Sequence, residues 1–311
     1  MKSLRILVTG GAGFIGSNIA DAFVDAGHSV VVVDNLSSGK RRNINPRATF
    51  YKADISDAKK MQEIFRKESI NLLNHHAAQI DVRKSVADPA CDARINVIGT
   101  LNLLEAAKNT GVGKVIFASS GGTIYGECGK NAPPETAPAN PLSPYGITKH
   151  TVEFYLKYYA KLFGMKFTVL RYANVYGPRQ DPHGEAGVVA IFSQRMLKDE
   201  KLFIYGNGKQ TRDYVFVGDV VRANIAALIK GDNEIINIGT GELTSVNDLY
   251  RKMAGIIEYK RPAVYKPARP GELSKSFLNF KKATKILRWR PQVGLNEGLR
   301  KTIEYFKGDC R

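Results

Sequence analysis

Cysteine is scarce in this chain: only three of its 311 residues are cysteines, and they lie far apart, at positions 91, 128 and 310. An odd and scattered set excludes a disulfide framework and is typical of a reducing compartment, so we expect a cytoplasmic protein. The ligand spacing of metal sites is absent as well. The one close histidine pair is His75 and His76, and adjacent residues of a strand point to opposite faces. We therefore expect no bound metal.

Long hydrophobic runs are also missing. A helix that crosses a bilayer needs about 20 predominantly apolar residues in succession, and no stretch of the chain reaches that length. The chain starts with a brief apolar run before Gly10, which is typical of a first strand and not of a signal peptide. We expect no membrane partner.

Acidic residues are few compared with basic ones: 29 against 46, which gives a net charge of +17. Much of the surplus lies in residues 251–311, which hold 16 lysines and arginines against five acids. Such a surplus attracts an anionic small molecule, nucleic acid or an anionic membrane face, or simply keeps a surface solvated. No compact basic helix is interleaved with stacking aromatics, so we do not expect a nucleic-acid partner.

Short runs of valine, isoleucine and leucine alternate with segments of helical periodicity, and 43% apolar content is enough for a full core. This alternation predicts an α/β fold with a parallel sheet. We place a first domain at 1–170 and a second domain at 171–311, with a segment near 213–240 that crosses back to the first. The predicted strands are 5–9, 29–33, 49–52, 70–75, 114–119 and 166–171.

Three glycines follow the first predicted strand at a spacing of three residues: Gly10, Gly13 and Gly16. Apolar residues at helical spacing come next. Glycines in this order suit a tight turn, close approach of the backbone to a pyrophosphate, and close packing of helix on strand. The diphosphate would lie over the positive end of the helix. The segment therefore predicts a dinucleotide site.

Asp34 ends the second predicted strand, 18 residues after Gly16. An acid at about this distance accepts hydrogen bonds from an adenosine ribose. It would repel the 2′-phosphate of NADP, so the sequence favours NAD as cofactor. Lys40, Arg41 and Arg42 keep NADP as an alternative.

Tyr145 and Lys149 are four residues apart and share one face if the segment is helical. A tyrosine phenol has an ordinary pKa of about 10 and is a poor base at neutral pH, but a nearby ammonium favours the phenolate. Such a pair alone is common on surfaces. Together with the glycine segment it predicts a base, Tyr145, and a lysine that lies near both the phenol and the cofactor ribose.

With these motifs in place, the chain resembles the extended short-chain dehydrogenase/reductase family. Within it, the chain looks most like the UDP-glucose (UDP-galactose) 4-epimerases, over nearly its whole length. The resemblance implies a Rossmann doubly wound parallel sheet with a smaller α/β substrate-binding domain, in which 1–170 is the NAD-binding domain and 171–311 the nucleotide-sugar-binding domain. The likeness is carried, in this order, by Thr9-Gly-Gly-Ala-Gly-Phe-Ile-Gly16, Asp34-Asn-Leu-Ser-Ser-Gly39, Asp54-Ile55, His76-Ala-Ala-Gln79, Asn96-Val-Ile-Gly-Thr100, Pro144-Tyr-Gly-Ile-Thr-Lys149, Leu170-Arg-Tyr-Ala-Asn-Val-Tyr-Gly-Pro178, Gln210-Thr-Arg-Asp-Tyr-Val-Phe-Val217 and Arg269-Pro-Gly-Glu272.

The resemblance implies a set of cofactor contacts beyond the glycines. Asp54 and Ile55 would contact the adenine, Ala77 and Ala78 would line the dinucleotide path, and Asn96 would close on the cofactor from the fourth strand. The full implied set is Gly10, Gly13, Phe14, Ile15, Gly16, Asp34, Asn35, Ser37, Ser38, Gly39, Asp54, Ile55, Ala77, Ala78, Asn96, Tyr145 and Lys149.

The resemblance also implies a nucleotide-sugar site. Arg212 and Arg269 would clamp the diphosphate, because the arginine fork suits phosphate oxygens. Glu272 would accept hydrogen bonds from the uridine ribose. The full implied set is Ser120, Thr123, Tyr145, Asn174, Val188, Val189, Tyr205, Arg212, Arg269, Glu272 and Ser276.

The chain departs from the family in the segment 117–126. Many relatives place the catalytic serine or threonine where this chain has Gly121, so the hydroxyl would come from Ser120, with Thr123 as second choice. A sugar 4,6-dehydratase would be expected to carry an Asp-Glu pair in place of Gly122 and Thr123. Without that acid and base, dehydration lacks its machinery.

The resemblance thus implies an isomerase that interconverts UDP-glucose and UDP-galactose through a transient 4-keto sugar and enzyme-bound NADH. Ser276, in place of a bulkier residue, implies that the N-acetylated pair is accepted as well. A nucleotide-sugar decarboxylase or dehydrogenase of the same family is the alternative enzyme, and an NAD-binding regulatory protein is the non-enzyme alternative. The resemblance further implies a homodimer that packs through helices near 95–108 and 145–162.

Overall fold

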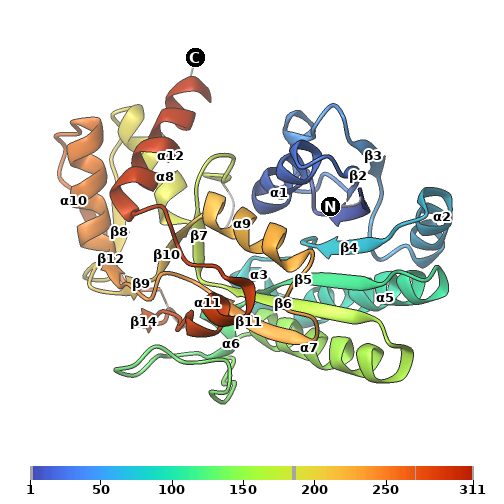
Figure 1. Cartoon of the computed structure of the whole chain (residues 1–311). Coiled ribbons are helices and arrows are strands. Elements are labelled where there is room, and N and C mark those ends of the chain that lie inside the picture. Colours follow the sequence, from blue (N-terminus) through green and yellow to red (C-terminus); the bar gives the residue numbers. More distant parts are fainter. Residues whose placement is uncertain (1–2, 184–186, 270, 310–311) are drawn as a thin grey trace.

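The computed structural model describes residues 3–183, 187–269 and 271–309. Its centre is a seven-stranded sheet in which every neighbouring pair of strands runs parallel (Figure 1). In spatial order the strands are β11 (Glu234–Ile238), β6 (Lys166–Tyr172), β5 (Lys114–Ser120), β4 (Leu72–His75), β1 (Arg5–Thr9), β2 (Ser29–Asp34) and β3 (Thr49–Lys52). The six predicted strands are confirmed.

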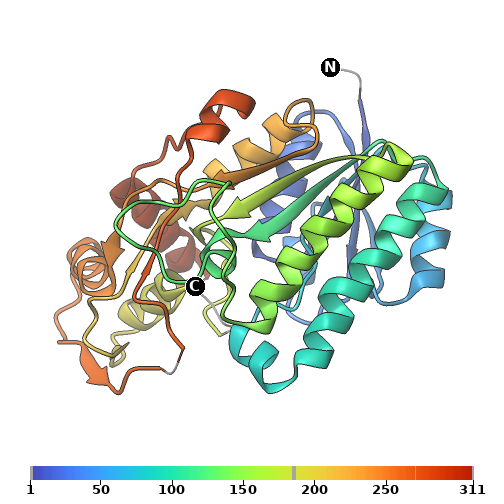
Figure 2. The ribbon, with the colours of Figure 1, turned by 90° about the horizontal axis from the view of Figure 1, so that it is seen from below.

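Both faces of this sheet are buried, which explains why its strands are continuous apolar runs. Alternate residues of β1 and β2 enter different cores: Val8 and Val32 enter one, and Leu7 and Val31 the other. The first core lies under α1 (Phe14–Asp25), α9 (Val217–Ala227) and α11 (Lys281–Leu287). The second lies under α2 (Ala58–Glu68), α5 (Gly99–Asn109) and α7 (Pro144–Phe163), which run beside one another in Figure 2. The predicted doubly wound α/β architecture is confirmed.

The edge strand β11 comes from the later part of the chain. After β10 (Tyr214–Phe216), helix α9 packs on α1, and β11 then pairs with β6. The segment expected to cross back, near 213–240, contains these elements.

A third core lies outside the large sheet and includes Phe192, Leu249 and Ile303. Three small sheets accompany it, with the strand orders β10-β7, β12-β9-β14 and β13-β8. The elements of this part are β7 (Asn174–Tyr176), α8 (Val188–Leu197), β8 (Phe203–Tyr205), β9 (Thr211–Arg212), β12 (Thr244–Ser245), α10 (Val246–Ile257), β13 (Val264–Lys266), β14 (Lys275–Ser276) and α12 (Leu295–Asp309). The remaining short elements are η1 (Arg41–Asn43), α3 (Val82–Ala87), α4 (Pro89–Ala93), the π-helical η2 (Arg94–Ile98) and α6 (Gly121–Ile124).

Helix α7 carries the predicted base, and capping residues define both of its ends. The hydroxyl of Ser143 accepts a hydrogen bond from the Gly146 N–H at 3.2 Å, and Pro144 fills the first helical position. Gly164 ends the helix at a φ of +67°, where a residue without Cβ is favoured. These local features set where the helix begins and ends.

Candidate active site

The glycine segment forms a tight turn between β1 and α1. Gly10 has a φ of +67°, and a Cβ there would lie 2.7 Å from the backbone nitrogen of Ala77. A Cβ on Gly16 would lie 2.3 Å from the carbonyl oxygen of Gly10. Helix α1 starts after Gly13 with no side-chain cap, so in the described residues the N–H groups of its first turn are left for another acceptor. The turn thus fits a diphosphate.

Asp34 ends β2 beside this turn, and its carboxylate is buried. It accepts hydrogen bonds from the backbone N–H groups of Ala12 at 3.0 Å and Leu36 at 2.8 Å. Two carboxylate oxygens have lone pairs beyond these two bonds, so a ribose hydroxyl fits as a further donor. Of the cations that kept NADP open, Lys40 pairs with Asp181 at 3.6 Å and Arg41 lies over the Phe50 ring. The surroundings of Asp34 favour NAD.

The predicted adenine contacts lie together at the next strand end. Asn35 donates to the carboxylate of Asp54 at 2.7 Å. Burial opposes ionisation of Asp54, but hydrogen bonds from Ser56 and Asn35 outweigh it and hold the Asp54 pKa below its usual value. Ile55 is buried beneath Gly99. Ser37 and Ser38 are exposed and Gly39 is half-buried, in the loop that follows Asp34.

The loop after β4 brings Ala77 and Ala78 next to the glycine turn, and the Ala77 N–H donates to the Thr9 hydroxyl. Asn96 corrects an expectation, because it lies in the π-helical turn η2 and not on the fourth strand. Its amide accepts from the Gln79 N–H at 2.9 Å and donates to the Gln79 carbonyl at 3.0 Å. Asn96 therefore holds the loop in shape.

Tyr145 and Lys149 lie on one face of α7, as their spacing predicts. The Lys149 ammonium is 5.9 Å from the Tyr145 ring centroid and donates to the Ala118 carbonyl at 2.9 Å. Its side chain also lies over the Phe117 ring. Lys149 is only 4% exposed. The helix and β5 thus hold the ammonium beside the phenol.

Burial lowers the pKa of Lys149 to about 8, while the nearby carboxylate of Asp92 acts in the opposite direction. The neighbouring imidazoles respond to the same environment. Burial and then the Lys149 charge lower the pKa of His75 far below its usual value and that of His76 to about 3. Both histidines are therefore neutral at pH 7, and Lys149 is the buried cation next to Tyr145.

The two candidates for the catalytic hydroxyl, Ser120 and Thr123, lie at the end of β5 on either side of Gly121. Ser120 is the last residue of the strand and is half-buried. The Thr123 hydroxyl is buried with no hydrogen-bond partner in the described residues, and its carbonyl oxygen lies 2.6 Å from the position of a Cβ on Gly146. At Gly121, a Cβ would lie 2.6 Å from two carbons of Leu278. Packing against Leu278 explains the glycine, and Thr123 lies against the first turn of α7.

The predicted sugar contacts meet next to Gly122. A Cβ on this glycine would lie 3.4 Å from the Ser276 hydroxyl and 3.9 Å from the Asn174 side-chain oxygen. Ser276 is buried and paired with Arg212 across β14 and β9. The structure therefore brings Ser276 and Asn174 from the second half of the chain to the end of β5.

The predicted nucleotide contacts form two pairs. Arg212 and Glu272 approach to 3.6 Å, and the Arg269 guanidinium lies 3.8 Å over the Tyr205 ring centroid. The hydrogen bond from Arg269 and its charge lower the pKa of Tyr205. These pairs place two guanidinium groups next to an acid and an aromatic ring, a set that suits a nucleoside diphosphate.

At the start of α8, Val188 is half-buried and Val189 has no exposed surface. Val189 belongs to the third core. The expectation that Val188 and Val189 meet the sugar nucleotide stays a prediction.

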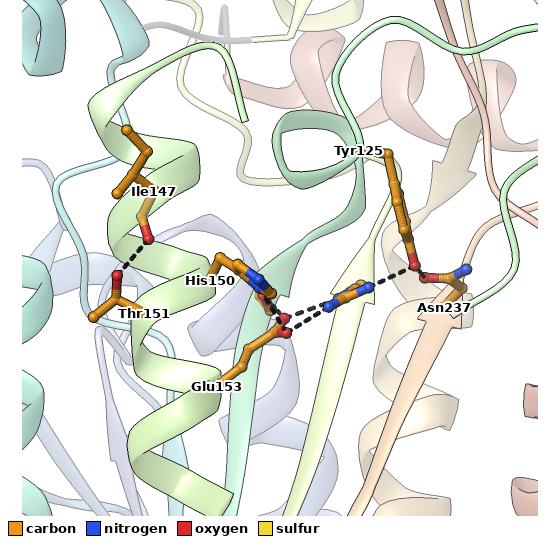
Figure 3. Close-up of polar contacts among 8 residues, drawn as sticks. Tyr125, Ile147, His150, Thr151, Glu153 and Asn237 are labelled. Carbon is orange, nitrogen blue, oxygen red and sulfur yellow. Dashed lines mark hydrogen bonds and ion pairs between the residues drawn. The ribbon is translucent and has the colours of Figure 1, made fainter. Parts of the chain in front are cut away.

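Sequence reasoning missed a buried polar network under the site (Figure 3). Arg171 donates two hydrogen bonds to Glu153 of α7, at 2.9 and 2.5 Å, and one to the Tyr125 phenol at 2.7 Å. Tyr125 donates to Asn237 of β11 at 2.9 Å, and Ser119 donates to Glu153 at 2.7 Å. One signal was available: Glu153 follows Lys149 by four residues and so shares its buried face.

In residues 3–183, 187–269 and 271–309, no group of three or more histidine, cysteine or acidic side chains has the arrangement of a metal site, and Cys91 and Cys128 are free. Cys310 lies outside the described residues. None of the helices in these ranges combines the length and apolar character needed to cross a bilayer.

Comparison with known proteins shows the family. Residues 6–239 match the model of the NAD dependent epimerase/dehydratase family. A UDP-glucose 4-epimerase of Mycolicibacterium smegmatis is 44% identical over 98% of this chain and 99% of its own length.

Two solved structures have nearly the same fold. A UDP-glucose 4-epimerase of Thermotoga maritima with UDP-glucose is 53% identical, with a TM-score of 0.98 over 99% of this chain and 100% of that one. A UDP-glucose 4-epimerase of Thermus thermophilus in complex with NAD is 44% identical, with a TM-score of 0.95 over 98% and 99%. The chain belongs to the NAD dependent epimerase/dehydratase family.

Proposed function

We propose that this protein is an isomerase that interconverts UDP-glucose and UDP-galactose by epimerisation at C4. The observation that carries the proposal is the position of Tyr145 and the buried Lys149, which lie on one helix face against the end of β5. The relatives named above support the substrate class: one was solved with UDP-glucose and another with NAD.

NAD fits the residues at the glycine turn. The N–H groups of the first turn of α1 and the backbone at Gly10 would receive the diphosphate, and Asp34 would accept a hydrogen bond from a ribose hydroxyl. When bound, NAD supplies the acceptor and later the donor of the C4 hydride. The cofactor part of the chain would comprise residues 1–170 with the segment near 213–240, and the rest of 171–311 would hold the nucleotide sugar.

The protein's own groups would handle the proton. Tyr145, as phenolate, would take the proton from the sugar 4-hydroxyl and return it after the keto sugar has turned over. The Lys149 ammonium would favour the phenolate. Ser120 would donate a hydrogen bond to the same sugar oxygen, with Thr123 as the second candidate for that role. Arg212 and Arg269 would hold the diphosphate while the keto sugar turns in the pocket, so that hydride returns to its opposite face.

The test is an assay of purified protein with UDP-galactose, which should yield UDP-glucose without net NADH formation. Tyr145→Phe should retain NAD but lose nearly all turnover, because only the proton acceptor is removed. Ser120→Ala should lower the rate by about 10²–10³-fold, the usual cost of losing a hydrogen bond to the reacting oxygen. A larger loss in Thr123→Val would assign the role to Thr123.

Several outcomes would refute the proposal. Near-normal turnover by Tyr145→Phe would contradict the mechanism. Release of carbon dioxide from a UDP-uronate would favour the decarboxylase alternative, and net NADH formation would favour the dehydrogenase. NAD binding without any conversion of a nucleotide sugar would favour a regulatory protein.

We also propose that the protein is a cytoplasmic homodimer. Helix α7 exposes Ile147, Phe154, Tyr158 and Leu162, each about half exposed, and Ile98 of η2 is exposed as well. Apolar surface of this extent on one helix commonly marks an interface between subunits. Gel filtration should give twice the chain mass of 34.3 kDa, and a species of the single-chain mass would contradict the dimer.

A further inference from the structure

Asp92 is a fully buried carboxylate that the predicted cofactor and substrate contacts do not include. It lies on the short helix α4 and has no exposed surface. One of its oxygens accepts from the Gln79 amide at 2.9 Å and the Asn96 amide at 3.0 Å, and the other accepts from the Thr148 hydroxyl at 2.8 Å. Each partner acts as a donor, which suits the ionised form of the carboxylate.

These three bonds join two parts of the candidate site. Gln79 belongs to the loop that lines the predicted dinucleotide path, and Thr148 is the neighbour of Lys149 on α7. The Thr148 hydroxyl also lies 3.0 Å from the carbonyl oxygen of Tyr145. Asp92 thus connects the loop to the helix turn that carries the Tyr145–Lys149 pair.

The charges around Lys149 give Asp92 a second role. Glu153, on the same helix, is held by two hydrogen bonds from Arg171, so its charge is balanced. His75 and His76, on β4 and the following loop, are neutral because burial and the Lys149 charge lower their pKa values. Tyr145 is the other titratable group on the face of α7 that carries Lys149. Asp92 favours the charged form of Lys149, and through its hydrogen bond with Thr148 it contacts the residue next to Lys149 on α7.

We propose that Asp92 is a positioning residue for the Tyr145–Lys149 pair: it fixes α7 against the Gln79 loop through Thr148, and it keeps the Lys149 ammonium charged. This inference rests on the proposed function for its effect on the rate, but its effect on Lys149 does not depend on turnover. An uncompensated ammonium in a buried site would lose its proton more readily.

The first test is Asp92→Asn, which keeps the shape of the side chain and removes its charge. Removal of a nearby anion lowers the pKa of a lysine, so the pKa of Lys149 should fall further below about 8. A carbon NMR titration of lysine-labelled protein measures this directly, with the Lys149 signal assigned by its absence in Lys149→Met. The alkaline limb of kcat/KM against pH should move to lower pH by a similar amount.

A second variant separates position from charge. Thr148→Val removes the hydroxyl that joins Asp92 to α7 and leaves the Asp92 charge in place. It should lower kcat several-fold with little change in KM for the nucleotide sugar, while the Lys149 titration stays near that of the wild type. An unchanged kcat in Thr148→Val would overturn the positioning role, even if Asp92→Asn failed to fold.

Asp219→Asn is a matched control, because Asp219 is also fully buried but lies on α9, where it accepts from the N–H groups of Gln292 and Val293. It should lower stability without moving the Lys149 titration or the pH profile. If Asp92→Asn leaves both unchanged, or Asp219→Asn shifts them equally, the charge role is wrong. Absence of epimerase activity in the wild type would instead refute the proposed function, and the NMR titration would still test Asp92.

Discussion

Gly121 stands where many members of the family carry the catalytic hydroxyl, so restoring a serine there is an informative perturbation. A Cβ at this position would lie 2.6 Å from both δ carbons of Leu278 and 3.1 Å from its γ carbon. Leu278 is 1% exposed and cannot swing into solvent. Overpacking of this kind costs about 1–3 kcal/mol. We expect Gly121→Ser to lower the free energy of unfolding by about 2 kcal/mol, near the middle of that range.

The double mutant with Leu278→Val tests the cause. Valine lacks the δ carbons that make the short contacts, and the loss of one methylene alone costs about 1 kcal/mol. If the contacts with Leu278 cause the loss, the double mutant should be clearly more stable than the sum of the two single effects predicts. Urea unfolding of the four proteins measures this coupling. A Gly121→Ser protein as stable as the wild type, or strictly additive effects, would refute the steric explanation.

Three further predictions concern residues away from Gly121. Glu153→Gln should cost about 3–5 kcal/mol in urea unfolding at pH 7, because it leaves the buried Arg171 charge unpaired; a loss below about 1 kcal/mol would contradict a stabilising pair. Burial opposes ionisation of Glu153, but hydrogen bonds from Arg171 outweigh it and lower the folded-state pKa of Glu153. The contribution of this pair to the free energy of unfolding is therefore present above the unfolded-state pKa, and it is lost as the pH falls through the folded-state pKa. Asp34→Ala should weaken NAD binding and reduce the preference for NAD over NADP, measured as the ratio of their dissociation constants in calorimetric titrations. If that ratio is unchanged, the group that discriminates between the cofactors lies elsewhere, near Lys40. Serine at position 276 is smaller than the bulky residue expected to reject an acetamido group, so UDP-N-acetylglucosamine should be a substrate of the wild type and a poor one for Ser276→Tyr. Equal kcat/KM in both proteins would refute this gate.

The cofactor half of the fold could be predicted because its signals are local. Buried parallel strands are continuous apolar runs, so segments such as 29–33 are visible without knowledge of their neighbours. The glycines are also local, since Gly10 needs its φ of +67° for the turn itself. β11 was harder to predict: Glu234–Ile238 contains two polar residues, and it becomes a sheet strand only because it pairs with β6.

The rest of the site depends on partners that are distant in the sequence. Asp92 and Glu153 look like ordinary surface acids of amphipathic helices, but packing against Thr148 and Arg171 buries them. Val189 belongs to the third core because α8 packs against α10 and α12, which lie far from it in the sequence. Asn96 lies on a π-helical turn, a local departure from helical geometry that residue spacing does not predict.

One face of α7 explains why catalysis and stability are linked in this fold. Tyr145, Lys149 and Glu153 follow one another at four-residue intervals, and β5 meets the last two: the Ala118 carbonyl accepts from Lys149, and the Ser119 hydroxyl donates to Glu153. These two hydrogen bonds fix the position of α7 along its axis relative to the end of β5. A shift of α7 along its axis would break both bonds and also move the phenol away from the end of β5. The buried Glu153 charge, two turns from Tyr145, is therefore part of what holds the predicted proton acceptor in place, although it is not among the predicted sugar or cofactor contacts.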